Sequence, residues 1–101
     1  MTKHSAREKQ IMKATLHLLK KELSPRRIIL FGSRAEGRAQ QGSDFDIAVD
    51  ARPPRFAKKR FLEEQIDSIA GLYRVDLVFL NKVSRGFRRI IERTGKIVYE
   101  R

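Results

Sequence analysis

The sequence contains no cysteine, only two histidines, and far fewer acidic than basic residues. Without cysteine, both a disulfide framework and a cysteine-ligated zinc site are excluded, which agrees with a reducing cytoplasm. His4 and His17 have no metal-ligand companion, so we expect both to be ordinary surface or boundary residues. No apolar run approaches the length that spans a membrane, and no apolar segment follows a basic start as in a secretion signal. These absences predict a soluble, cytoplasmic protein.

The charge balance is strongly basic. Lysine and arginine number 23 against 12 aspartate and glutamate residues, which gives a net charge of +11. Such a charge predicts attraction to polyanions, which include nucleotides, nucleic acid and acidic protein surfaces, but it is equally compatible with a solvated surface of basic bias. With 101 residues, 41% of them hydrophobic, the chain is expected to form a single domain spanning residues 1–101 around one modest core.

Helical and strand patterns alternate along the chain. Ser5 and Glu8 have the spacing of a capping box, and Pro25 marks the end of the first helix. Hydrophobic periodicity predicts helices at 5–23, 33–38, 56–69 and 84–94, and strands at 26–31, 45–49, 73–80 and 96–100. The last helix is expected to turn Phe87, Ile90 and Ile91 inward. This order predicts an α/β (α+β) fold, with a small mixed β-sheet and helices mainly on one face.

The most informative stretch is 28–49, where an apolar run ends abruptly at Gly32 and Ser33. Glycine lets the backbone approach a phosphate closely, and peptide N–H groups and the serine hydroxyl are hydrogen-bond donors. A helix beginning at Ser33 would add a favourable dipole for an anion. The turn is therefore predicted to be an anion cradle.

Two carboxylates flank Phe45 at the start of the next strand. A strand alternates its faces with period two, so Asp44 and Asp46 point the same way. Adjacent carboxylates repel and are tolerated in solvent or around a cation, and magnesium suits them because it prefers hard oxygen ligands. An anion cradle beside a pair of metal ligands predicts a nucleoside triphosphate with its metal.

A third carboxylate, Asp76, lies in the middle of the apolar run 73–80. An isolated acid in such a run is unexpected on packing grounds. If this strand lies beside the acidic strand, Asp76 becomes a third metal ligand. The alternative is an aspartate that faces an arginine in a salt bridge.

The segment Phe31-Gly32-Ser33, a spacer of roughly ten residues, and then Asp44-Phe45-Asp46-Ile47 resembles the signature of nucleotidyltransferases of the DNA polymerase β superfamily. Within it, Gly-Ser-Arg-Ala-x-Gly and Ser-Asp-x-Asp-Ile-x-Val are similar to the minimal nucleotidyltransferases. The resemblance implies ATP as substrate and two Mg²⁺ ions. It assigns the metal ions and catalysis to Asp44, Asp46 and Asp76, and the phosphates to Gly32 and Ser33.

Two further residues of the motif have two open interpretations each. Arg34 would neutralise charge on the leaving group, or it would pair with Glu36 or another surface acid. Ser43 would contact the nucleotide, or it would anchor the acidic strand.

The resemblance also suggests a partner. Larger members of the superfamily hold their acceptor with extra domains, whereas small minimal nucleotidyltransferases are commonly paired with HEPN-domain toxins and attach AMP to a toxin tyrosine. It therefore implies an antitoxin that adenylylates a HEPN partner. Two alternatives remain open: a non-catalytic antitoxin that neutralises its partner by binding, and a nucleic-acid-binding module that uses the basic segment 52–60. Two observations weigh against the latter: the sequence has no recognised nucleic-acid-binding motif, and few aromatic residues are interleaved with its basic residues.

Overall fold

The computed structural model describes residues 6–40 and 42–101, so Ser5 and His4 lie outside the described residues. The elements are α1 Ala6–Leu23, β1 Arg27–Phe31, the 3₁₀-helix η1 Gly32–Arg34, β2 Phe45–Asp50, α2 Phe56–Ala70, β3 Val75–Phe79, α3 Arg85–Thr94 and β4 Lys96–Glu100. Their order is the one expected from the sequence. Within the described ranges, no helix combines the length and the apolar character needed to cross a membrane.

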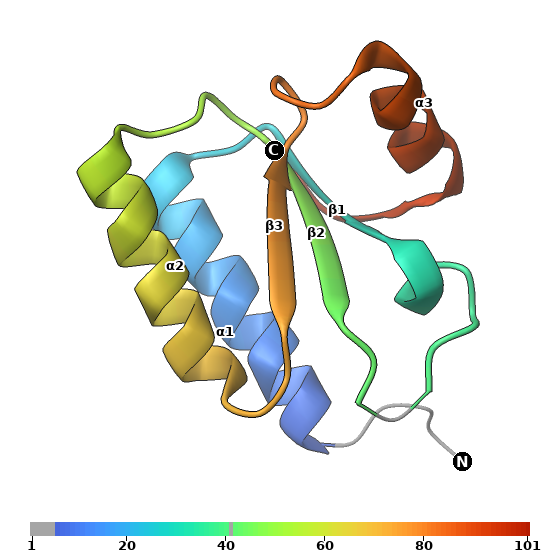
Figure 1. Ribbon diagram of the computed structural model, residues 1–101, viewed down its shortest axis with the longest axis horizontal. Helices are drawn as coiled ribbons and strands as arrows, with labels where there is room; N and C mark the ends of the chain where they lie inside the picture. The colour runs from blue at the N-terminus through green and yellow to red at the C-terminus, as the bar shows by residue number, and fades with distance from the viewer. Residues whose placement is uncertain (1–5, 41) are drawn as a thin grey trace.

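The strands form one mixed sheet in the order β3-β2-β1-β4. Strand β1 is antiparallel to both β2 and β4, whereas β2 and β3 are parallel and are connected through α2. In Figure 1, α1 and α2 lie side by side against one face of the sheet, and α3 lies toward the other. The expected mixed sheet with helices mainly on one face is therefore confirmed.

The core has two parts because β2 alternates its side chains between the two faces. Phe45, Ile47 and Val49 point toward α1 and α2 and belong to the larger cluster. On the opposite face, Ala48 packs in a smaller cluster, which comprises Ile29, Ala48, Leu80 and Ile91. The same alternation puts Asp46 on the face of Ala48, which is the face toward α3.

Helix α3 buries less than its sequence pattern predicted. Ile91 is fully buried, but Ile90 is 57% exposed and Phe87 is 39% exposed, so the expected inward orientation is wrong for Ile90 and only partly met by Phe87. The physical reason is that this ten-residue helix meets the sheet mainly through Ile91, which packs with Ile29 and Ala48. The apolar face of α3 is therefore wider than the part of it that packs against the sheet.

Candidate active site

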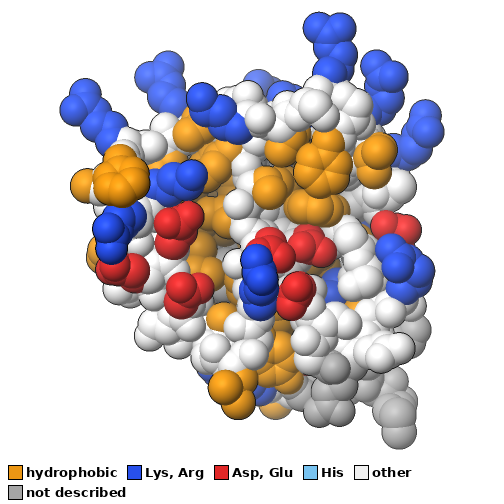
Figure 2. All heavy atoms as spheres, in the orientation of Figure 1, with side chains coloured by type: hydrophobic (Ala, Val, Ile, Leu, Met, Phe, Trp, Pro, Cys, Tyr) orange, Lys and Arg blue, Asp and Glu red, His pale blue; other side chains and the backbone are white. Residues whose placement is uncertain are grey.

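Strand pairing brings two of the candidate carboxylates into one row. Asp46 is paired with Phe31 on one side and with Asp76 on the other. Paired residues on neighbouring strands point to the same face, so these side chains cross the sheet in a single line. Asp44 directly precedes β2 and has the same strand parity as Asp46. Figure 2 shows a group of acidic side chains in the middle of this face, with a basic side chain among them.

The three carboxylates interact electrostatically. Partial burial raises the pKa of Asp46 above its ordinary value of 3.8, and the negative charges of Asp76 and then Asp44 raise it further. Arg74 opposes these effects, since its positive charge lowers the pKa of Asp46. The Nε atom of Arg74 donates to Oδ1 of Asp76 at 2.9 Å. Asp76 therefore has the arginine partner of the alternative interpretation and also lies in register with Asp46.

The chemistry of this row fits a hard divalent cation, although in the described part of the chain no group of three or more His, Cys, Asp or Glu side chains is already gathered as a metal site. Mg²⁺ prefers carboxylate oxygens and retains bound waters. The mutual repulsion that raises the pKa of Asp46 is what a cation would relieve. At present the Arg74 guanidinium is the cation beside these carboxylates, and its side chain is 74% exposed, which leaves it room to turn outward.

Gly32 sets the distance between the turn after β1 and the carboxylate row. Its φ is +75°, and a Cβ atom at this position would run into the carboxylate of Asp46. Only glycine therefore allows the turn to pass against Asp46. The expected helix at 33–38 is instead the three-residue η1, followed by a turn at Gly37 with φ +73°. So short an element has little helix dipole, so an anion here would depend on individual N–H groups and the Ser33 hydroxyl.

Arg34 is buried and holds the loop that leads into β2. Its Nη2 atom lies 3.1 Å from Oε2 of Glu8, and the side chains of the pair are 1% and 2% exposed. The guanidinium also donates to the carbonyl oxygens of Ser43 at 2.6 Å and Asp44 at 3.2 Å. It lies over the ring of Phe45, 3.9 Å from the centroid. These contacts make Arg34 a positioning residue for Asp44.

The ion pair of Arg34 was not foreseen in this form. The sequence offered Glu36 or a surface acid as partner, whereas Glu36 pairs with Arg38 at 3.4 Å and Arg34 reaches back to Glu8 on α1. No local pattern reveals a contact between residues this far apart in the chain.

Ser43 closes the turn before β2. Its Oγ atom accepts a hydrogen bond from the backbone N–H of Gln40 at 2.9 Å, and its own N–H donates to the carbonyl of Gln40 at 3.0 Å. These bonds agree with the anchoring interpretation of Ser43. A contact of Ser43 with nucleotide stays a prediction.

We expect Gly32→Ala to reduce the nucleotidyl transfer that the motif implies by about a hundredfold or more, because the new methyl group displaces Asp46. The left-handed φ adds about 1–2 kcal/mol of backbone strain. Gly37→Ala is the matched control, since Gly37 has φ +73° but nothing within 4 Å of its Cβ position. Thermal denaturation and transfer assays of both variants test this: equal activity in the two would contradict the role assigned to Gly32.

We expect Arg74→Gln to raise the pKa of Asp46 further, because it removes the positive charge that lowers it. Ionised Asp46 is the form that binds a cation, so the acid limb of the pH–activity profile moves to higher pH. Carboxyl-carbon NMR titration of Asp46 in the metal-free protein measures the shift. Arg38→Gln, which removes an exposed arginine paired with Glu36, serves as control and leaves the titration unchanged.

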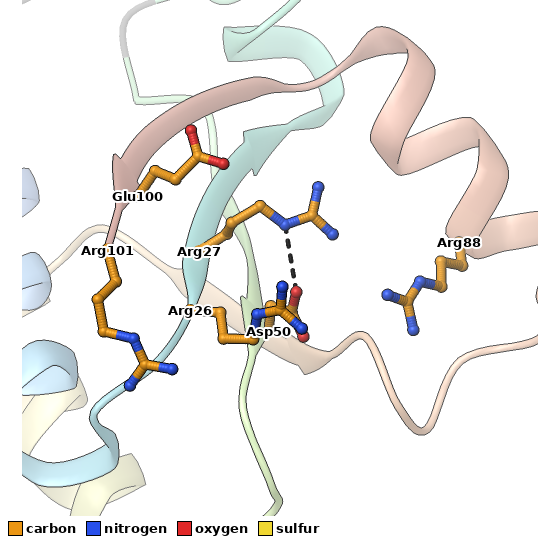
Figure 3. Close-up of a pocket in the computed structure, with 6 residues that line it drawn as sticks. All are labelled: Arg26, Arg27, Asp50, Arg88, Glu100 and Arg101. Carbon is orange, nitrogen blue, oxygen red and sulfur yellow. Dashed lines mark hydrogen bonds and ion pairs between the residues drawn. The ribbon is translucent and has the colours of Figure 1, made fainter.

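A second charged hollow lies at the other end of β2 (Figure 3). It has a volume of about 390 Å³ and is lined by Arg26, Arg27, Asp50, Arg88, Glu100 and Arg101. Within it, Nε of Arg27 lies 3.2 Å from Oδ2 of Asp50. Asp50 is four residues beyond Asp46, which corresponds to about 13 Å along a strand. No lining residue is aromatic, so this hollow has basic charge but no platform for stacking bases.

The mixed sheet, the glycine turn after β1 and the carboxylates at the start of β2 and within β3 define the class of nucleotidyltransferases. The family model described as Polymerase beta, Nucleotidyltransferase matches residues 13–101, and the chain belongs to this family. The resemblance inferred from the motif is thereby confirmed.

Relatives within the family include a protein adenylyltransferase and solved toxin–antitoxin complexes. The protein adenylyltransferase MntA of Thermococcus cleftensis is 37% identical over 82 residues, which cover 80% of each chain. A toxin–antitoxin structure with AMP-PNP has a TM-score of 0.68 at 28% identity, and the match covers 88% of this chain and 73% of that one. A complex of a tri-AMPylated Shewanella oneidensis HEPN toxin with its MNT antitoxin has a TM-score of 0.68 at 26% identity, covering 94% and 73%.

Proposed function

We propose that this protein transfers AMP from ATP to a hydroxyl group, that of a tyrosine, on a HEPN-domain partner and thereby acts as an antitoxin. The observation that carries the proposal is the row of Asp46 and Asp76, with Asp44 beside it, directly against the glycine turn at Gly32. The names of the relatives support the acceptor, since one is a protein adenylyltransferase and another is bound to an AMPylated HEPN toxin.

In the proposed reaction the acceptor oxygen attacks the α-phosphorus of ATP, the bond to the bridging oxygen breaks, and pyrophosphate leaves. Backbone N–H groups at Gly32 and Ser33 bind the β- and γ-phosphates and orient the leaving group in line. Asp76, at the edge of the row, faces the acceptor and receives its proton. Two Mg²⁺ ions, held by Asp44, Asp46 and Asp76 when bound, would supply the neutralisation of phosphate charge. Arg34 keeps Asp44 in place through the carbonyl bonds described above.

The test is label transfer from α-labelled ATP with magnesium, using the purified protein alone and co-purified with the product of the neighbouring gene. Label on the partner, matched by an AMP-sized increment in intact mass and absent with Asp44→Asn, is the expected result. A tight complex without label on either protein would contradict the enzymatic proposal and favour neutralisation by binding alone.

A further inference from the structure

An exposed aromatic side chain lies close to the carboxylate row. The ring of Phe87, on α3, meets the ring of Phe31 edge to face, with centroids 5.8 Å apart and an interplanar angle of 82°. Phe31 is itself the register partner of Asp46 and directly precedes Gly32. Phe31 therefore connects the glycine turn and the carboxylates on one side with Phe87 on the other.

Phe87 has the properties of a binding surface rather than of a core residue. Its side chain remains 39% exposed, and Ile90, one turn further along α3, is 57% exposed. Figure 2 shows hydrophobic side chains directly beside the acidic group on this face. The position is also held firmly, since the N–H of Phe87 donates to Oγ of Ser84, the N-cap of α3, at 3.2 Å. An exposed apolar patch bordered by polar groups is typical of a binding site.

We propose that Phe87 stacks against the nucleobase of the bound triphosphate. This inference rests on the proposed function, because it requires a nucleotide whose phosphates lie at the glycine turn. In this proposal the nucleotide extends from Gly32 past Phe31, which is in register with Asp46 and in contact with Phe87, and its base meets the Phe87 ring. Stacking uses the π-face that every base has, so Phe87 contributes affinity for a base without selecting among bases by hydrogen bonds. The arginine-lined hollow of Figure 3 offers no such ring.

The absence of tryptophan from the chain allows a direct readout. In Phe87→Trp the single indole would lie at the proposed base site, and ATP is expected to quench its fluorescence. Inorganic tripolyphosphate, which has the phosphates but no base, is expected to leave it unchanged. Phe56→Trp is the matched control, because Phe56 is 74% exposed at the start of α2, away from the carboxylate row. The fluorescence of this variant should change with neither ligand. An unchanged signal of Phe87→Trp at saturating ATP would overturn the proposal.

Calorimetry on the same proteins separates this inference from the proposed function. We expect Phe87→Ala to weaken ATP binding by about 5- to 150-fold and to leave tripolyphosphate binding unchanged, whereas Phe56→Ala changes neither. Phe87→Leu, which keeps apolar volume but loses the ring, should resemble Phe87→Ala and guards against a folding defect. Tight ATP binding that none of the Phe87 variants weakens would refute the base site while the proposed function stands. Failure of the wild-type protein to bind ATP would refute both.

Discussion

Asp46→Asn should reduce nucleotidyl transfer by about a thousandfold or more without lowering the melting temperature. In the proposed mechanism the loss follows because neutral asparagine would no longer be a metal ligand between Asp44 and Asp76, and several kcal/mol of charge stabilisation in the transition state would be lost. Steady-state label transfer measures the rate, and thermal denaturation measures stability.

The raised pKa of Asp46 determines how Asp46→Asn changes the stability of the fold. The pKa of Asp46 is raised in the folded protein, so its stabilising contribution is fully present below its unfolded pKa and is lost as pH rises through the folded pKa. At neutral pH the charged carboxylate therefore disfavours folding, and asparagine relieves this. Asp50→Asn is the matched control, because Asp50 lies on the same face of β2 but pairs with Arg27. Equal loss of activity in both variants would show that Asp46 has no special role.

The second large effect concerns stability. Glu8→Gln or Arg34→Met should lower the free energy of unfolding by about 3–5 kcal/mol, because each removes one partner of a buried ion pair and leaves the other charge buried without it. For a domain with about 5–15 kcal/mol of total stability this is a severe loss. Urea denaturation monitored by circular dichroism measures it. The double variant Glu8→Leu/Arg34→Met should lose less than the sum of the single losses, since both charges of the ion pair are then removed together.

An exposed ion pair provides the comparison. Arg60 and Glu64 lie 3.7 Å apart on α2 with side chains 64% and 67% exposed, so Glu64→Gln should change stability by less than about 0.5 kcal/mol. If Glu8→Gln were equally mild, the Glu8–Arg34 pair would not be what holds the loop before Asp44. Transfer activity should fall together with stability in the Arg34 variant, because that loop carries Asp44 into position.

The parts of the structure that were predictable from the sequence depend on local signals. Period-two alternation identified Asp44 and Asp46 as sharing a face, and a lone acid in an apolar strand drew attention to Asp76, whose register with Asp46 the sheet then supplied. The collision that makes Gly32 indispensable involves Asp46 across the sheet, so the sequence could suggest the glycine but not its reason.

The features that were missed depend on long-range packing. Glu8, in the first turns of α1, reaches Arg34 in the turn after β1, and no spacing rule predicts that contact. The exposure of Phe87 follows from how α3 rests on the sheet through Ile91, which helical periodicity does not determine. Arg74 was also missed. It lies beside the three carboxylates because its guanidinium donates to Asp76, whereas the sequence shows only that the two residues are close together in the chain.

The central claim is that the carboxylate row binds metal ions and the triphosphate. Anomalous diffraction from crystals grown with Mn²⁺ and a non-hydrolysable ATP analogue tests it most directly. The account predicts manganese peaks coordinated by Asp44, Asp46 and Asp76, with the phosphates against Gly32 and Ser33. Nucleotide bound in the arginine-lined hollow near Asp50, with no manganese at the carboxylate row, would contradict it.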